Sequence, residues 1–303
     1  MRLDGELVGL APLVVHRRGP FRIARVLGED PSDYWDVLAR PDLRGEVCGA
    51  VAGALVERRG EWDALVLSHL VPGSALPEAA RNAGLRLFAR STAPYPRVEL
   101  PASFDKYLES VSRNRRSNLR RHLRRLDEGE VTLHEVEDPA EVPAAVARWQ
   151  ELHVTQWREL GKSVRPEHAT PRFRALLSEA LAAMVPAGLA AVWEFSQSER
   201  VVGSYVNFTD RRSFYQYLGG FDPEVGRLGL GKLSIIHGIR SSIEQGREHY
   251  DFMLGSEQHK YFFEARDRQV ESATFRSSRP ASRIATGLLT GRARVKASLQ
   301  GAE

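Results

Sequence analysis

Cysteine is almost absent from this chain of 303 residues, which contains Cys48 alone. A single cysteine excludes an internal disulfide framework and a cysteine-based metal cluster. The nine histidines form no H-x-x-x-H or H-E-x-x-H pair, so we expect no zinc site and no other metal cofactor.

Long apolar runs are absent as well. No segment approaches the roughly 20 residues that a membrane-spanning helix requires. Asp4 and Glu6 interrupt the first residues, where a signal peptide would need an unbroken apolar stretch. Hydrophobic residues make up 42% and charged residues 27%, which is ordinary for a globular protein. We therefore expect a cytoplasmic protein of one large or two medium domains.

Basic residues are concentrated in two segments, 113–125 and 276–303. The first holds seven arginines and no acid, and the second holds six basic residues and one acid. Of the 43 basic residues, removal of those seven leaves 36, fewer than the 39 acidic ones. A broad nucleic-acid footprint is therefore not expected, although a helix with seven arginines could contact phosphates, or simply be solvated.

A glycine-rich loop at 226–232, Gly-Arg-Leu-Gly-Leu-Gly-Lys, precedes an apolar-periodic segment at 233–243. Such a loop opening a helix presents backbone N–H groups and a positive helix end to an anion. The loop also satisfies G-x-x-x-x-G-K, but Leu233 stands where an ATP-binding P-loop needs Ser or Thr. A phosphate-bearing cofactor, a P-loop and a turn without ligand all stay open at this point.

Helix and strand patterns alternate through the second half of the chain. Ser103 is the expected cap of a helical region that runs through the arginines, packs through Leu119 and Leu123, and ends at Gly129. The remaining patterns predict helices at 141–160 and 173–184, strands at 190–195, 201–207 and 213–218, and, after the glycine loop, a helix and a strand ending near Asp251.

The first half repeats this order more loosely. A turn and strand at 4–15, an apolar-periodic segment at 47–56 and a strand at 62–67 parallel the elements at 198–208, 233–243 and 250–254. Two halves with one order of elements and similar spacing predict a duplicated α/β unit.

Three stretches carry a resemblance to a known family. They are the arginine helix at 113–129, the run from Phe214 to Pro223 that leads to Gly231, and Tyr250-Asp-Phe followed by Gly255, Glu257 and Lys260. In this order they resemble the GNAT acyltransferase superfamily, and more closely its CelD-type branch, which is related to the Fem-type peptidyltransferases. The chain departs from the branch pattern at Gly226, at Leu254 and Ser256, and at His259.

The resemblance implies an α/β fold of tandem GNAT-like units with mixed sheets flanked by helices. The expected parts are a partial unit at 1–100, a connecting helical region at 101–129, a complete acyltransferase unit at 130–278 and a basic tail at 279–303, whose order is left open. The N-terminal unit is expected to lack its early elements, so that only the second unit holds cofactor.

The implied activity is transfer of an acyl group, with acetyl favoured, from acyl-CoA to an amine of a small molecule, sugar or peptide. Fem-type relatives suggest an aminoacyl-tRNA-dependent peptidyltransferase as the alternative. The departures and the short first unit suggest a second one, a binding or assembly protein whose active site has decayed. The oligomeric state is left open.

Amine acylation needs positioning, a proton acceptor and oxyanion stabilisation more than covalent help from the protein. Asp251 and Glu257 are the candidate bases, and Lys260 could face the developing oxyanion. The candidate cofactor ligands are Arg227, Leu228, Gly229, Leu230, Gly231 and Lys232. The candidate substrate contacts are Arg116, Arg120, Gln216, Tyr217 and His259.

Overall fold

The computed structural model describes residues 1–29, 31–161 and 163–289. The chain forms two compact units, one of residues 1–94 with the segment from Arg268 onward, the other Tyr95–Asp267. The crossings therefore fall at 94/95 and 267/268, so the segment after Asp267 returns to the first unit. The sequence placed these boundaries near 100 and 278. Part of the expected tail is helical, at 282–289, and the rest of it lies outside the described residues.

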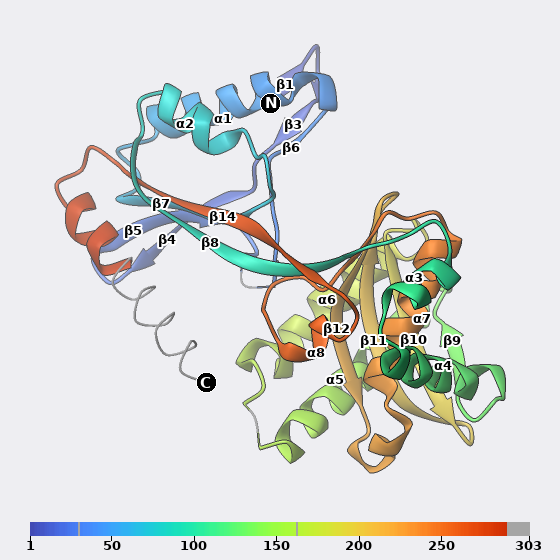
Figure 1. The fold of residues 1–303 in the computed structure, drawn as a ribbon. Helices are drawn as coiled ribbons and strands as arrows, with labels where there is room; N and C mark the ends of the chain where they lie inside the picture. Colours follow the sequence, from blue (N-terminus) through green and yellow to red (C-terminus); the bar gives the residue numbers. More distant parts are fainter. Residues whose placement is uncertain (30, 162, 290–303) are drawn as a thin grey trace. The chain divides into compact units, whose positions relative to one another are not determined.

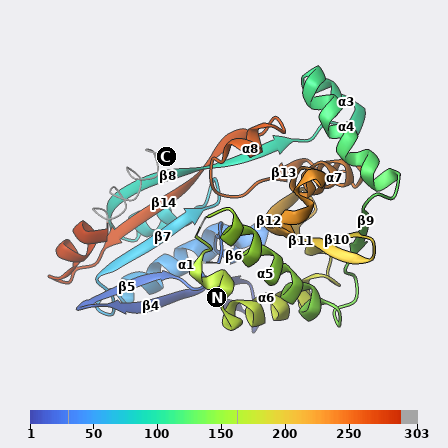
Figure 2. The same ribbon diagram turned by 90° about the horizontal axis from the view of Figure 1, so that it is seen from below.

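Unit 1 is a sheet with helices on both faces (Figures 1 and 2). Its strands lie in the order β4-β5-β7-β14-β8. One face packs under α1 and α2 around Trp62, Leu65 and Phe275. The other face packs through Ile23, Ala64 and Ala285, the last from the helix at 282–289. The elements are β1 (Arg2–Leu3), β2 (Glu6–Leu7), β3 (Gly9–Leu10), β4 (Leu13–Arg18), β5 (Phe21–Val26), β6 (Leu38–Ala39), η1 (Pro41–Leu43), α1 (Arg44–Glu57), β7 (Ala64–Leu70), α2 (Leu76–Asn82), β8 (Arg86–Glu99) and β14 (Arg266–Arg276).

Unit 2 is built on the strand order β8-β13-β12-β11-β10-β9, with the last residues of β8 paired antiparallel to β13. Its elements are α3 (Phe104–Ser110), α4 (Arg113–Asp127), β9 (Thr132–Glu135), α5 (Val142–Glu159), η2 (Pro166–Ala169), α6 (Pro171–Met184), β10 (Ala190–Gln197), β11 (Arg200–Thr209), β12 (Ser213–Phe221), η3 (Pro223–Leu228), α7 (Leu230–Glu244), β13 (His249–Asp251) and α8 (Gln258–Tyr261).

Alternation along β10 divides unit 2 into two cores. Trp193 and Phe195 face the core under α3, α4 and α7, whereas Ala190 and Val192 face the core under α5 and α6. This is the period of two that a strand buried on both faces requires. The predicted mixed α/β architecture with helices on both faces of its sheet is confirmed.

Local signals explain the helix boundaries in unit 2. Ser103 accepts a hydrogen bond from Lys106 N and Ser112 accepts one from Arg115 N, so two caps divide the predicted helical region into α3 and α4. Leu119 and Leu123 are buried, as the spacing predicts, and Gly129 follows the end of α4 with a φ of +72°. α4 thus has one buried edge and a basic remainder.

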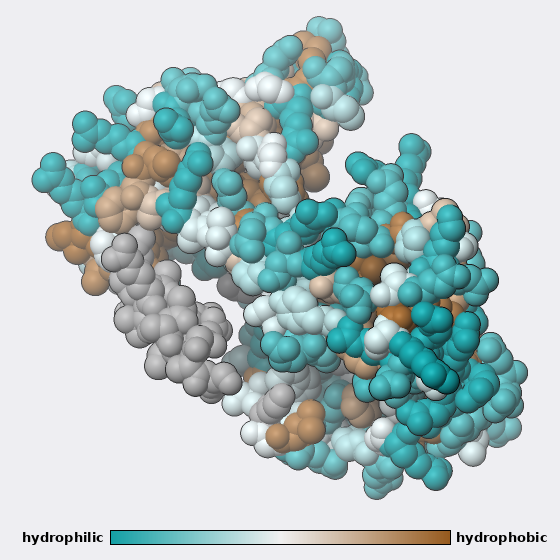
Figure 3. Space-filling view, viewed as in Figure 1, coloured by the Kyte–Doolittle hydropathy of each residue, from teal (hydrophilic) through white to brown (hydrophobic). Residues whose placement is uncertain are grey.

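On the face drawn in Figure 3, hydrophilic residues cover most of the area and hydrophobic residues occur in separate patches. Within the described residues, no helix is long and apolar enough to cross a bilayer.

Candidate functional site

The centre of unit 2 is a parallel crossover from β12 through η3 and α7 to β13. The parallel pairs run from Ser213–His249 to Tyr215–Asp251, yet β12 continues to Phe221. Along β12 the register to β11 shifts at Tyr217, where one extra residue stands between the partners of Val206 and Asn207. A bulge of this kind bends the strand and increases its twist. The two strands therefore diverge toward the end at which α7 begins.

The glycine loop supplies the start of α7. Asp222 caps η3 by accepting a hydrogen bond from Glu224 N, at 2.9 Å. Gly229 then adopts a left-handed conformation with a φ of +64°, and α7 begins at Leu230 with no side-chain cap and no acid in its first turn. Lys232 N already donates to Gly229 O, at 3.0 Å. The amides of Leu230 and Gly231 are therefore the donors that this helix end presents.

α4 packs against the same loop and lies beside α7 (Figure 1). Arg125 donates from Nη1 to Leu228 O, and a Cβ added to Gly229 would lie 2.4 Å from His122 Cε1. Burial, followed by the charge of Arg125, lowers the pKa of His122 to about 4. His122 is consequently neutral near pH 7, and only a glycine fits against it at position 229.

His122 and Arg125 were not among the candidates from the sequence. The available signal was the position of His122 beside Leu123 on the apolar stripe of the arginine helix, which marks it as facing the interior.

Phe262 lies between two cations near this loop. Lys232 Nζ stands 4.8 Å and the Arg115 guanidinium 5.5 Å from the centre of its ring. Arg115 also pairs with Glu264 at 2.5 Å. Lys232 remains exposed, as does Arg227, so both can add positive charge near the start of α7.

The segment after β13 is held by its own polar side chains. Asp251 is 3% exposed, and its Oδ1 accepts a hydrogen bond from Met253 N at 2.7 Å. Buried Lys260 donates to Leu254 O at 2.8 Å and Gly255 O at 3.0 Å, and it pairs with Glu257 at 2.8 Å. Lys260 thereby ties the segment into one turn rather than standing as an open cation.

Glu257 is the more accessible of the two carboxylates, with 59% of its side chain exposed. Partial burial raises and the hydrogen bond and charge of Lys260 lower the pKa of Glu257, and the net shift is downward. Glu257 is thus ionised near neutral pH and able to accept a proton.

The remaining candidates lie on different sides of the sheet. Gln216 is 3.5 Å from the hydroxyl of Tyr250, whereas Tyr217 packs on Phe208 with 5.0 Å between ring centres, against the core under α5 and α6. Arg116 donates to the carbonyls of Glu109 and Val111 at the end of α3. Arg120 and His259 are exposed.

Two further histidines, His153 and His168, lie on the far side of β12. Their ring nitrogens are 3.3 Å apart, and His153 Nδ1 is 2.8 Å from Gly219 O. A Cβ added to Gly220 would lie 2.6 Å from His153 N, so α5 approaches β12 closely here. Burial, and then the charge of His153, lowers the pKa of His168 to about 4, which marks this pair as part of the core rather than a reacting base.

Comparison with known proteins identifies a domain within unit 2. Residues 113–261 match the family model described as an acetyltransferase (GNAT) domain. No curated protein matches the sequence significantly.

Several solved structures share the fold at low identity. FemX has a TM-score of 0.63 and 11% identity, and the match covers 90% of this chain and 86% of that one. The C-terminal domain of a lysylphosphatidylglycerol synthetase homologue from Agrobacterium fabrum has a TM-score of 0.55 and 14% identity, with 92% and 84% covered. A conserved protein from Bacteroides thetaiotaomicron has a TM-score of 0.52 and 10% identity, with 89% and 84% covered.

The match to this domain model identifies an acyltransferase. Residues 113–261 form a GNAT acetyltransferase domain, and the chain shares the fold of FemX. The predicted α/β fold class is confirmed with it.

Proposed function

We propose that the chain is a CelD-type N-acyltransferase that uses acyl-CoA, with acetyl-CoA favoured, to acylate an amine of a small molecule, sugar or peptide. GNAT domains in general imply an acyl-CoA donor. The observation that carries the proposal is the start of α7, where a left-handed Gly229, an uncapped helix end and the absence of an acid in the first turn favour a diphosphate.

In this proposal the amides of Leu230 and Gly231 hold the diphosphate of the donor, while Arg227 and Lys232 add charge. The loop from Leu228 to Gly229 keeps its shape because α4 packs against it. The acyl end of the donor then extends along β12 toward Gln216, where that strand diverges from β13.

Glu257 is our choice as proton acceptor, because its carboxylate is ionised and accessible. The attacking amine forms a bond to the thioester carbonyl carbon, the carbon–sulfur bond breaks, and the amine proton passes to Glu257 directly or through water. Asp251 and Lys260 position this carboxylate by fixing the turn from Asp251 to Lys260. Tyr217 and His259 are kept as contacts to the acceptor.

Titration of the full chain with coenzyme A tests the donor. We expect micromolar binding and release of free thiol when acetyl-CoA is mixed with a panel of amines. Silence toward coenzyme A together with tight binding of MgATP would contradict the proposal and favour a P-loop at Gly226–Lys232.

The exposed arginines of α4, including Arg120, could contact the phosphates of an alternative donor, an aminoacyl-tRNA. If the donor is an aminoacyl-tRNA, activity in a charged-tRNA assay disappears after ribonuclease treatment, whereas turnover of acetyl-CoA does not change. A chain that binds coenzyme A but never turns over a thioester would support the decayed binding protein instead.

A further inference from the structure

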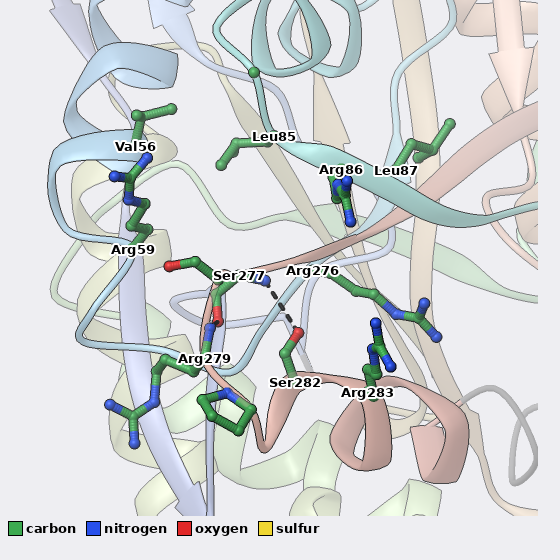
Figure 4. Close-up of a pocket in the computed structure, with 13 residues that line it drawn as sticks. Val56, Arg59, Leu85, Arg86, Leu87, Arg276, Ser277, Arg279, Ser282 and Arg283 are labelled. Atoms are coloured by element: carbon green, nitrogen blue, oxygen red, sulfur yellow. Dashed lines mark hydrogen bonds between the residues drawn. The ribbon is translucent and has the colours of Figure 1, made fainter.

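Unit 1 contains a cavity of about 1020 Å³ whose lining is strongly basic. It lies where the end of α1, the start of β8 and the end of β14 meet, followed by the helix at 282–289. Figure 4 shows arginines on each of these segments. The five arginines that line it are Arg59, Arg86, Arg276, Arg279 and Arg283, and no acidic residue is among its lining residues.

One of these arginines is held in place without being neutralised. Arg276 is half-buried, its guanidinium stands 3.7 Å from the centre of the Phe88 ring, and its Nε donates to Thr286 Oγ1 at 2.9 Å. Stacking and a neutral hydrogen-bond acceptor orient the guanidinium while leaving its charge uncompensated. This is the preorganisation that an anion-binding group requires.

A second arginine anchors the wall of the cavity. Arg279 pairs with Asp63 at 2.7 Å, and Asp63 is only 1% exposed, so this charge is neutralised inside the protein. Arg59, Arg86 and Arg283 are exposed, and no carboxylate pairs with any of them in the part of the chain that the structure describes. Four positive charges therefore remain for a ligand.

Hydroxyl and apolar groups complete the lining. Ser277, Ser278 and Ser282 supply hydroxyls, although Ser282 Oγ already accepts a hydrogen bond from Ser277 N at 3.1 Å. Buried Leu85 and half-buried Leu87 form an apolar part of the wall. The cavity can thus contact an organic group beside its anionic one.

We propose that this cavity is a binding site for an organic diphosphate. A guanidinium can bind a phosphate through two parallel hydrogen bonds, and four uncompensated guanidinium groups exceed what one phosphate can engage. The site is separate from the proposed donor site, because it lies at the carboxyl end of α1 in unit 1, whereas the donor site lies at the amino end of α7 in unit 2.

Calorimetric titration of the full chain tests this with three probes: inorganic diphosphate, ADP and orthophosphate. We expect diphosphate and ADP to bind at least tenfold more tightly than orthophosphate. The double variant Arg86→Gln/Arg283→Gln should weaken both by at least tenfold. These two side chains are exposed, so the fold should survive, and thermal unfolding of the variant checks it.

Matched controls separate this site from the donor site. Arg172→Gln/Arg174→Gln removes two exposed arginines of α6 and should leave ADP binding unchanged. Gly229→Ala should weaken the binding of coenzyme A but not the binding of ADP at this cavity. The proposal is overturned if orthophosphate binds as tightly as diphosphate, if ADP does not bind below millimolar concentration, or if the Arg86/Arg283 variant binds ADP like the wild type. None of these results depends on acyl transfer.

Discussion

The two units contain the same parallel crossover, but the start of its helix differs between them. In unit 1, β5 pairs in parallel with β7 after passing through α1, and in unit 2, β12 pairs with β13 after α7. Each parallel ladder has three pairs, Ile23–Ala64 to Arg25–Val66 and Ser213–His249 to Tyr215–Asp251. The topology alone therefore does not decide which crossover binds a ligand.

The difference lies in what fills the space beyond the third pair. In unit 1 the chain bridges Trp35 to Leu70 in parallel, with Trp35 N donating to His69 O at 3.3 Å and Trp35 O accepting from Val71 N at 3.1 Å. Among the described residues of unit 2, no isolated bridge does the same beside β13. In unit 1, the backbone at Trp35 therefore fills the space beside β7 that lies beyond the third parallel pair.

The helix ends differ in charge as well. α1 begins with Arg44, paired to Asp36, and carries Glu46 in its first turn. An acid at this position satisfies the positive end of the helix and repels a second anion. Neither helix has a side-chain cap, but α7 has no acid in its first turn. The same crossover is thus self-satisfied in unit 1 and open to an anion in unit 2.

Removing the Trp35 side chain at the bridge in unit 1 should give the largest effect. Trp35→Ala deletes a half-buried indole and its hydrogen bond to Ser68 O, and we expect a loss of about 3 kcal/mol in the free energy of unfolding. Coenzyme A affinity should stay within about twofold. Denaturant unfolding and calorimetry measure the two quantities, and a large loss of affinity would place the donor site in unit 1.

Crowding the glycine loop should give the next effect, on affinity. Gly229→Ala puts a Cβ in a left-handed residue and against His122, which costs about 2 kcal/mol, or about thirtyfold in the dissociation constant for coenzyme A. Gly226→Ala is the matched control, because a Cβ there meets nothing within 4 Å. Equal affinities for the two variants would mean that the loop does not hold the donor.

Acid should weaken the packing of α4 against this loop. The pKa of His122 is about 4 in the folded chain, below its ordinary value of 6.5, so folding opposes protonation. Its contribution to stability is present above pH 6.5 and is lost as the pH falls toward 4, with a cost of about 2 kcal/mol by pH 5. His122→Gln should flatten part of this slope in unfolding measured against pH. His168 has a similarly lowered pKa and should account for a remaining part.

The smallest effect is expected from the arginines of α4. Arg120→Gln should raise the Michaelis constant for donor or acceptor by about threefold, an effect of about 0.6 kcal/mol, because an exposed charge is screened by solvent. Arg116→Gln should act mainly on stability, since Arg116 bonds the carbonyls at the end of α3. Wild-type kinetics in the Arg120 variant would mean that Arg120 contacts neither the donor nor the acceptor and is only solvated.

The sequence predicted the elements of unit 2 well, because their signals are local. Ser103, the leucine stripe of α4 and the period-two strands each identify an element without knowledge of its neighbours. The family resemblance rested on the same segments. What it did not predict is the return of the chain to unit 1 after Asp267, since the pairing of β14 with β7 joins residues about 200 positions apart.

The site was predicted less completely, for a similar reason. The loop at Gly226–Lys232 follows from composition, but its partners His122 and Arg125 come from a helix about 100 residues earlier. Lys260 illustrates the opposite problem. A lysine near two carboxylates suggests an open cation, whereas its carbonyl partners, Leu254 and Gly255, carry no signal in the sequence because any residue supplies a carbonyl.

Hydrogen exchange of the backbone amides, with and without coenzyme A, tests the central claim most directly, because the groups proposed to bind are themselves amides. We predict protection of the segment at 226–234, with no change at the start of α1, residues 40–48. Protection at 40–48, or a chain saturated with coenzyme A whose amides at 226–234 exchange as fast as in the free protein, would contradict the account.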